Sequence, residues 1–289
     1  VHVRLVGPLA ELLTRVDKEL YTPYLTQEKG KSVMYVQLQK ALYGTLSAAL
    51  LFWEDLSSHL LAEGFVANPY DSCVMNKMVN GKQCTVLWHV DDLKISHVDS
   101  NVVTEVIQQL DGTLGKEAPL TVTRGKVHEY LGMTLDFSSQ GKVKIYMIDY
   151  IDNMLDKMPL KFDGEAATAA ANHLVEVNTK YPTMLDEEKA TMFHHNVAKL
   201  LFLCKRARPD TQTAVAFLCT RVKGPDTDDY KKLGRVIKYL RGTKGMPLTL
   251  EGDNACIIKW WVDASFAVHP DMKSHTGGAM TLGKGAVYG

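Results

Sequence analysis

An Asn-Gly dipeptide between two strand-like runs is the feature that most restricts how this chain can fold. Residues 72–79 (SCVMNKMV) and 83–90 (QCTVLWHV) flank Asn80-Gly81, and LKISHV follows at 93–98. Asn-Gly favours a two-residue hairpin turn, because both central residues of that turn need a positive φ. The stretch 72–98 therefore predicts a three-stranded antiparallel meander, with Asp91 and Asp92 at its second turn.

The two adjacent aspartates raise an electrostatic question, because like charges in contact repel each other. Neighbouring strand residues point to opposite faces, so two adjacent carboxylates address one site only at a tight turn. Mg²⁺ (or Mn²⁺), held by carboxylates and substrate phosphates, would resolve the repulsion, and two such ions favour phosphoryl transfer. The alternative is a turn that leaves both carboxylates in water. Asp228-Asp229, a second such pair, is interpreted as an ordinary acidic helix start.

Outside the meander, periodicity and capping residues predict both helices and strands, so we expect a mixed α/β (α+β) protein. Gly64 ends the first predicted helix, Asp99 caps the second, and a connector without a clear period lies at 159–183. Helices are predicted over 46–62, 101–114, 148–158, 186–207, 210–222 and 228–242. Strands are predicted over 121–127, 128–137, 142–147, 248–251, 256–263 and 277–283, with a Gly-Lys-Gly turn at 283–285.

Composition indicates an ordinary globular protein of one large or two modest domains, with 289 residues, 46% hydrophobic and 23% charged. No apolar stretch reaches membrane-spanning length, and no secretory signal pattern opens the chain. The five cysteines form no Cys-x-x-Cys motif, which favours reduced thiols in an intracellular protein. His194-His195 with Cys204 and Cys219 fits no zinc spacing.

Positive charge is concentrated in one part of the chain although the formal net charge is zero. Residues 199–244 carry twelve Lys or Arg and four acidic residues, an excess of eight positive charges that is typical of nucleic-acid contact. The alternatives are a solvated helix face and capping of helix C-termini. The candidates for contact with a nucleic-acid backbone are Lys205, Arg206, Arg208, Lys231, Lys232, Arg235, Lys238 and Arg241.

The blocks around the paired aspartates resemble the reverse transcriptase of copia-type LTR retrotransposons, an RNA-dependent DNA polymerase. They are KALYGTLSAALLFWEDL (40–56), GFVANPYDSCVMNK (64–77), WHVDD (88–92) and HEYLGMTLDF (128–137), followed by KLLFLCKRARPDTQTAVAFLCTRV and DDYKKLGRVIKYLRGT. WWVDASFAVHPDMKSHTGGAMTLGKGAVYG resembles the first hairpin of the RNase H domain. The resemblance implies a right-hand polymerase with fingers and an antiparallel palm sheet at 1–158, a helical thumb/connection at 159–245, and the N-terminal part of an RNase H-like domain at 246–289.

The resemblance also implies a role for individual residues. Asp91 and Asp92 match the metal-binding pair, and Asp263 matches the first metal-binding aspartate of RNase H. His89 stands where the family has an aromatic residue and would contact the primer end; the alternative is a histidine that merely finishes a strand. Leu42, Tyr43 and Gly44 match the helix beneath nucleotide and template, and Tyr130, Leu131, Gly132 and Met133 match the primer grip.

Two departures from the family pattern limit these expectations. The family's other palm aspartate, in an Asp-Val-x-x-Ala-Phe-Leu stretch, would precede Val1, and the remaining RNase H carboxylates would lie beyond Gly289. The family's Lys-Gln-Ala-Pro is replaced by Thr-Leu-Ser-Ala-Ala at 45–49. We therefore expect a polyprotein fragment that is inactive alone.

The resemblance implies that the intact enzyme adds deoxynucleotides to a primer on an RNA or DNA template. Its partners would be primer–template, dNTPs and the rest of the polyprotein, without a membrane, in a cytoplasmic particle or the nucleus. The alternative is a catalytically incomplete, nucleic-acid-binding remnant of such an element.

Overall fold

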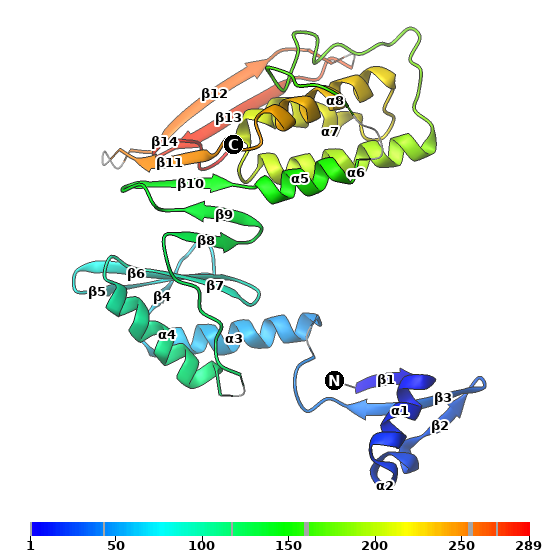
Figure 1. Ribbon diagram of the computed structural model, residues 1–289, viewed down its shortest axis with the longest axis vertical. Helices are drawn as coiled ribbons and strands as arrows, with labels where there is room; N and C mark the ends of the chain where they lie inside the picture. Colours follow the sequence, from blue (N-terminus) through cyan, green and yellow to red (C-terminus); the bar gives the residue numbers. More distant parts are fainter. Residues whose placement is uncertain (1, 43, 117, 159–161, 254–256, 270) are drawn as a thin grey trace. The chain divides into compact units, whose positions relative to one another are not determined.

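A computed structural model describes residues 2–42, 44–116, 118–158, 162–253, 257–269 and 271–289. The chain forms two compact units, Val1–Thr121 and Val122–Gly289. Helices and strands are mixed in both units, in agreement with the predicted α/β (α+β) class (Figure 1). All pairs of described strands are antiparallel.

The first unit contains a small N-terminal sheet, a second sheet and two long helices. Its elements are β1 His2–Val6, α1 Pro8–Val16, α2 Lys18–Tyr21, a 3₁₀ turn Thr22–Tyr24, β2 Thr26–Glu28, β3 Lys31–Gln37, α3 Leu46–Ala62, β4 Val66–Ala67, β5 Val74–Val79, β6 Lys82–His89, β7 Asp92–Ser96 and α4 Ser100–Leu114. The N-terminal sheet has the order β1-β3-β2, and the second has the order β4-β5-β6-β7.

The predicted meander is confirmed as β5, β6 and β7. Asn80 and Gly81 have φ of 50° and 71°, the two positive values that a type I′ turn needs, and Val79 pairs with Lys82 across them. The short strand β4, which the sequence did not predict, adds to the outer side of β5.

One face of this sheet packs against α3 and α4. Cys84, Val86 and Trp88 alternate along β6 and are buried, with Leu60 of α3 and Val106 of α4 in the same hydrophobic cluster. This alternation places Thr85, Leu87 and His89 on the other face of β6.

The second unit contains a five-stranded sheet, a two-stranded sheet and a group of helices. Its elements are β8 Val127–Tyr130, β9 Met133–Asp136, β10 Lys142–Tyr146, α5 Ile148–Asp156, α6 Glu187–Cys204, a 3₁₀ turn Pro209–Thr211, α7 Gln212–Arg221, α8 Thr227–Gly242, β11 Leu248–Gly252, β12 Lys259–Ser265, β13 His275–Thr281 and β14 Gly283–Lys284. The larger sheet has the order β14-β11-β10-β9-β8, and β12 pairs with β13 alone.

Two strand predictions in this unit were wrong in detail. HEYLGMTLDF is a hairpin rather than one strand, because Leu131 and Gly132 have φ of 52° and 74° and form a tight turn between β8 and β9. Of the strand predicted over 121–127, only Val127 belongs to β8. The predicted Gly-Lys-Gly turn contains the two-residue strand β14, which pairs with β11.

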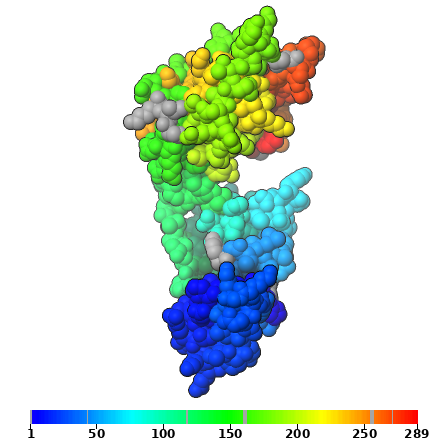
Figure 2. Space-filling model, turned by 90° about the vertical axis from the view of Figure 1, so that its right-hand side faces the viewer, coloured from blue at the N-terminus to red at the C-terminus, as the bar shows by residue number. Residues whose placement is uncertain are grey.

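The helices of the second unit enclose its hydrophobic core. Phe193 and Leu200 of α6, Leu218 of α7, and Val236 and Leu240 of α8 are fully buried in one cluster. Figure 2 shows the surfaces of these helices, yellow-green to yellow, in contact on this face of the second unit. The predicted helices are thus confirmed. The described part of the connector, residues 162–183, contains no helix or strand longer than a bridge, and Pro159, the predicted helix end, lies outside the described residues.

The two compact units do not coincide with the three predicted domains. The division lies between Thr121 and Val122, and β11, within the predicted RNase H-like segment, pairs with β10 from the predicted palm segment. The predicted domain boundaries at 158/159 and 245/246 were drawn from the functional regions of the family, and they stay predictions. No helix among the described residues is long and apolar enough to cross a membrane.

Candidate active site

The paired aspartates lie at the free end of the β6–β7 hairpin. Trp88, the penultimate residue of β6, is only 4% exposed and fastens the strand to the core. His89 then pairs with Asp92, so Val90 and Asp91 form the two-residue turn. Because side chains alternate along a strand, the burial of Trp88 places His89 on the opposite face of β6, directly across from Asp92. The Cβ atoms of residues paired in this way lie about 5 Å apart.

The backbone of this turn is strained. Val90 has a φ of 56° and is half exposed, so its burial does not explain the conformation. A left-handed conformation costs an L-residue roughly 1–2 kcal/mol, and a β-branched side chain makes it rarer still. The ladder on both sides of the turn imposes it, and strain of this kind is concentrated at functional sites.

Asp91 and Asp92 are both exposed, which leaves their carboxylates accessible to a cation. Mg²⁺ commonly takes one or two protein carboxylates and completes its octahedron with water and substrate phosphates, so this donor set fits that mode of binding. The described residues contain no group of three or more His, Cys, Asp or Glu that could hold a metal ion by themselves. The turn thus offers two candidate ligands that leave room for water and substrate.

A lysine that the sequence interpretation missed lies on the same face as Asp92. Lys94 is two residues further along β7 and pairs with Leu87, while Leu93 and Ile95 pack toward the core. Burial lowers the pKa of the Lys94 ammonium group. The sequence did contain a signal for this position, because side chains two residues apart in a strand, such as 92 and 94, lie on the same face.

The segment matched to the helix beneath the nucleotide precedes α3. Leu42 is half exposed, and its carbonyl accepts a hydrogen bond of 2.7 Å from the Thr45 hydroxyl, which in turn caps α3 by accepting from the Ala48 amide at 3.3 Å. Gly44 has a φ of 84°. Tyr43 lies outside the described residues.

The residues matched to the primer grip form the tip of the β8–β9 hairpin in the second unit. Tyr130 pairs with Met133, and Leu131 and Gly132 make the turn between them. Gly132 is exposed and the other three are partly buried. The sequence predicted a continuous strand here, and the turn at Leu131 and Gly132 was missed.

Arg208, a predicted nucleic-acid contact, is buried within the second unit. It is 1% exposed and donates to both carboxylate oxygens of Asp210 at 2.7 and 2.9 Å. It also donates to the carbonyl of Thr243 at 3.0 Å and to its hydroxyl at 2.7 Å. A guanidinium enclosed in this way is not accessible to a phosphate, so we remove Arg208 from the candidate nucleic-acid surface.

Several basic side chains of α8 hold the connector rather than facing open solvent. Lys232 is 6% exposed; it forms an ion pair with Asp228 at 2.9 Å and donates to the Glu176 carbonyl. Arg235 donates to the hydroxyl of Thr168 at 2.9 Å, and Arg241 donates to the Phe162 carbonyl.

The remaining basic candidates are more accessible. Lys205 and Lys231 are exposed, and Lys238 is partly exposed. Arg206 lies over the ring of Phe202 at 3.6 Å, and the ammonium of Lys205 donates to the Gly289 carbonyl. The candidate nucleic-acid surface is therefore smaller than the sequence predicted.

Asp263 lies on the exposed ribbon of β12 and β13. It pairs with Gly277, and its carboxylate accepts a hydrogen bond of 2.9 Å from the Ala264 amide. The side chain is exposed and remains accessible to a ligand.

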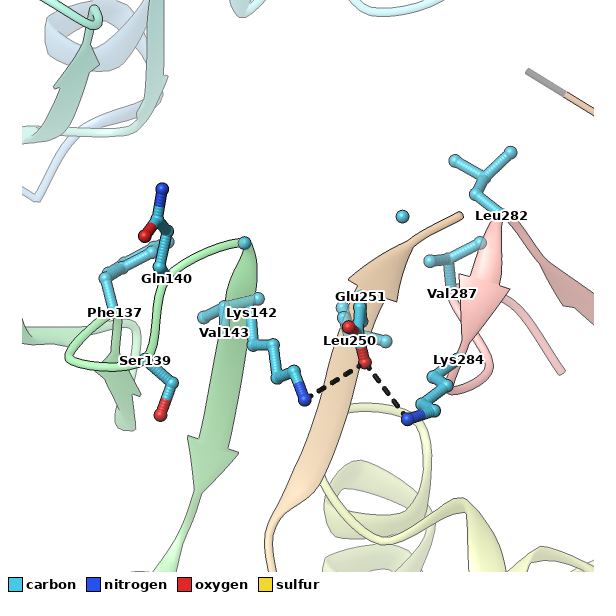
Figure 3. Close-up of a pocket in the computed structure, with 12 residues that line it drawn as sticks. Phe137, Ser139, Gln140, Lys142, Val143, Leu250, Glu251, Leu282, Lys284 and Val287 are labelled. Atoms are coloured by element: carbon cyan, nitrogen blue, oxygen red, sulfur yellow. Dashed lines mark ion pairs between the residues drawn. The ribbon is translucent and has the colours of Figure 1, made fainter. Parts of the chain in front are cut away.

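A cavity of about 420 Å³ lies beside the five-stranded sheet. Figure 3 shows Lys142 and Lys284 on either side of Glu251. The ammonium nitrogen of each lysine lies 3.3 Å from the Glu251 carboxylate. The lysines lower the pKa of Glu251, Lys284 through the larger effect. Phe137 and Val287 are among the apolar residues of the wall. The row of charges crosses three adjacent strands.

Comparison with known proteins finds one family profile and several transposon proteins that are similar to this chain. A profile of the family described as reverse transcriptase (RNA-dependent DNA polymerase) matches residues 9–170, more than half of the chain. The retrovirus-related Pol polyprotein from transposon TNT 1-94 of Nicotiana tabacum is 27% identical over 281 residues, which cover 94% of this chain and 21% of that polyprotein. The putative transposon Ty5-1 protein of Saccharomyces cerevisiae is 24% identical over 280 residues, with 96% and 88% covered.

A third relative, the retrovirus-related Pol polyprotein from transposon RE2 of Arabidopsis thaliana, is 25% identical over 256 residues, with 87% and 17% covered. The chain thus spans about a fifth of the length of the two Pol polyproteins. No solved structure matches the chain.

Proposed function

The chain belongs to the reverse transcriptase (RNA-dependent DNA polymerase) family of copia-type LTR retrotransposons, and from this premise we propose that Asp91 and Asp92 serve template-directed DNA synthesis in a Pol polyprotein. The observation that carries the proposal is the strained, exposed turn between β6 and β7, which presents two carboxylates at the end of a strand fastened by buried Trp88. A reaction that transfers a phosphoryl group needs such positioning more than it needs covalent chemistry.

Asp91 and Asp92 would hold Mg²⁺ or Mn²⁺ together with water and the phosphates of the incoming nucleotide. When bound, the cation neutralises negative charge on the phosphoryl oxygens. Asp91, within the turn, is the principal ligand in this proposal. His89 faces the same side as Asp92 and would contact the primer end. The β6–β7 ladder on both sides of the turn would keep both carboxylates in place.

Further functional assignments rest on the family. Residues 1–158 would form fingers and palm, 159–245 the thumb/connection, and 246–289 the N-terminal part of an RNase H-like domain with Asp263 as a metal ligand. Leu42, Tyr43 and Gly44 would lie beneath nucleotide and template, and residues 130–133 would grip the primer. The tight β8–β9 turn supports the last assignment, because its compact tip can approach a nucleic-acid backbone.

Primer extension tests the proposal in a polyprotein segment that includes this chain and the polymerase residues on its N-terminal side. With Mg²⁺ present, Asp91→Asn should reduce the rate of nucleotide addition at least about a hundredfold, because a metal ligand contributes several kcal/mol. Asp55→Asn, at an exposed carboxylate of α3, is the matched control and should leave the rate unchanged. Equal rates for Asp91→Asn and the parent would show that the pair has another role.

A second candidate function is nucleic-acid binding without catalysis. The excess of positive charge in 199–244 favours it, and Lys205, Lys231 and Lys238 remain accessible. Binding of a labelled primer–template should weaken steeply with salt, since each phosphate contact releases counterions. Replacing these three lysines by Gln should reduce both the affinity and the salt slope. Salt-independent binding, or rapid primer extension by the polyprotein segment, would rule this candidate out.

A further inference from the structure

Two histidines meet at the loop end of the β12–β13 ribbon, where His275 lies two strand pairs beyond the pair of Asp263 and Gly277. His269 lies in the loop between the two strands, and His275 is the first residue of β13. Their Nε2 atoms are 2.6 Å apart, and the ring centroids are 4.5 Å apart. Two ring nitrogens therefore point at the same place.

Backbone contacts and ring packing on both sides hold this arrangement. The His269 amide donates to the Lys273 carbonyl at 3.2 Å, and the Met272 amide donates to the His269 carbonyl at 2.9 Å. The His269 ring is parallel to Phe217, with an interplanar angle of 3° and a centroid distance of 5.9 Å. His275 is fixed by the ladder, in which it pairs with Ser265.

At 2.6 Å the two Nε2 atoms must share one proton, because two protonated nitrogens would repel and two bare nitrogens would oppose their lone pairs. Neutral imidazole is the form that binds metal ions. A cation that replaces the shared proton would meet a lone pair from each ring, and the proton would pass to solvent.

We propose that His269 and His275 form a binding site for a borderline transition-metal cation of the Zn²⁺, Ni²⁺ or Cu²⁺ class. Imidazole suits these ions, whereas Mg²⁺ prefers oxygen ligands. Zinc–nitrogen bonds of about 2.0–2.1 Å at a tetrahedral angle place the two nitrogens roughly 3.3 Å apart, so the rings separate by less than about 1 Å. Water would fill the other coordination positions of the cation, since the described residues offer no cluster of three ligating groups.

The site would fasten the loop after β12 to the start of β13. The metal would then restrain the ribbon that carries Asp263 without using that carboxylate. This inference does not depend on polymerase activity, because it concerns two residues outside the proposed polymerase site.

Calorimetric titration of the untagged chain with Zn²⁺ tests the site. His269→Asn and His275→Asn should each weaken zinc binding at least tenfold. The double substitution His194→Asn and His195→Asn is the matched control, because those histidines are exposed neighbours on α6 whose ring centroids are 6.3 Å apart. It should leave the affinity unchanged. Equal affinities for the parent and both single variants would overturn the proposal.

A second measurement keeps the test valid if a variant fails to fold. In the parent protein, Zn²⁺ should shift or broaden the imidazole resonances of two of the ten histidines before the others. Mg²⁺ at the same concentration should leave them unchanged. Assignment of the two responsive resonances to any histidines other than 269 and 275 would contradict the proposal, as would an equal response to Mg²⁺.

Discussion

Replacing Arg208 separates a structural role from a nucleic-acid contact. In Arg208→Met, Asp210 loses the partner whose guanidinium donates at 2.7 and 2.9 Å, and Thr243 loses two hydrogen bonds. Breaking a buried ion pair by removing one partner costs about 3–5 kcal/mol. The Asp210 side chain is 28% exposed against 2% for Arg208, so water can reach the carboxylate and the lower end, about 3 kcal/mol, is expected.

The assay is urea denaturation followed by far-ultraviolet circular dichroism, with Arg206→Met as the matched control. Arg206 lies over the Phe202 ring in a partly exposed position, so its loss should cost less than about 1 kcal/mol. Primer–template affinity of folded Arg208→Met should equal that of the parent. A cost equal to that of Arg206→Met, together with weakened nucleic-acid binding, would refute the structural role.

The stability lost in Arg208→Met should also depend on pH, in a direction set by the pKa of Asp210. Burial alone would raise the pKa of Asp210, but the hydrogen bonds from Arg208 and Tyr239 and the charge of Arg208 outweigh it, so the pKa is lowered. A carboxylate with a lowered native pKa stabilises the fold above its unfolded pKa of about 3.9, and this contribution is lost as pH falls through the native pKa. The stability difference between the parent and Arg208→Met should therefore shrink below about pH 4. A difference that grows on acidification would contradict the assignment.

Three further substitutions test the packing, each by its effect on the free energy of unfolding in urea. Gly234→Ala would place Cβ 2.5 Å from the Phe162 ring and should destabilise the fold by roughly 1–3 kcal/mol. Its control, Gly245→Ala, meets nothing within 4 Å and should be near neutral. Equal effects of the two substitutions would contradict the close packing of the connector on α8. Asp226→Ala removes the capping box of α8 and should cost about 1–2 kcal/mol; no loss would mean that the cap is unimportant. Gly81→Ala forces a left-handed conformation on alanine and should cost roughly 1–2 kcal/mol in the first unit; an unchanged midpoint would indicate that the turn rearranges.

Sequence signals sufficed where a short segment determines its own structure. Asn80-Gly81 specified its turn, and Asp99 caps α4 by accepting from the Asn101 amide at 2.9 Å. Asp228-Asp229 is an acidic helix start, as interpreted from the sequence, and Asp229 also completes the capping box. Each of these features depends on groups within a few residues of one another.

Sequence signals failed where distant residues decide the structure. A leucine seldom adopts a positive φ, so Leu131-Gly132 gave no strong indication of a turn. The burial of Arg208 depends on Thr243, and that of Lys232 on the carbonyl of Glu176, which lies 56 residues away in sequence. Charge density in a sequence does not distinguish a side chain that binds phosphate from one that holds its own chain. The pairing of β10 with β11 likewise joins segments about 100 residues apart in sequence, as their registers require.

The polymerase proposal depends on the ability of the Asp91–Asp92 turn to hold a divalent cation. Paramagnetic broadening of backbone amide resonances by Mn²⁺ measures this directly in the folded chain. The account predicts that the amides of Val90, Asp91 and Asp92 broaden first, that Mg²⁺ reverses the effect, and that Asp91→Asn removes it while Asp55→Asn does not. Broadening that begins elsewhere, or that persists at the turn in Asp91→Asn, would contradict the account.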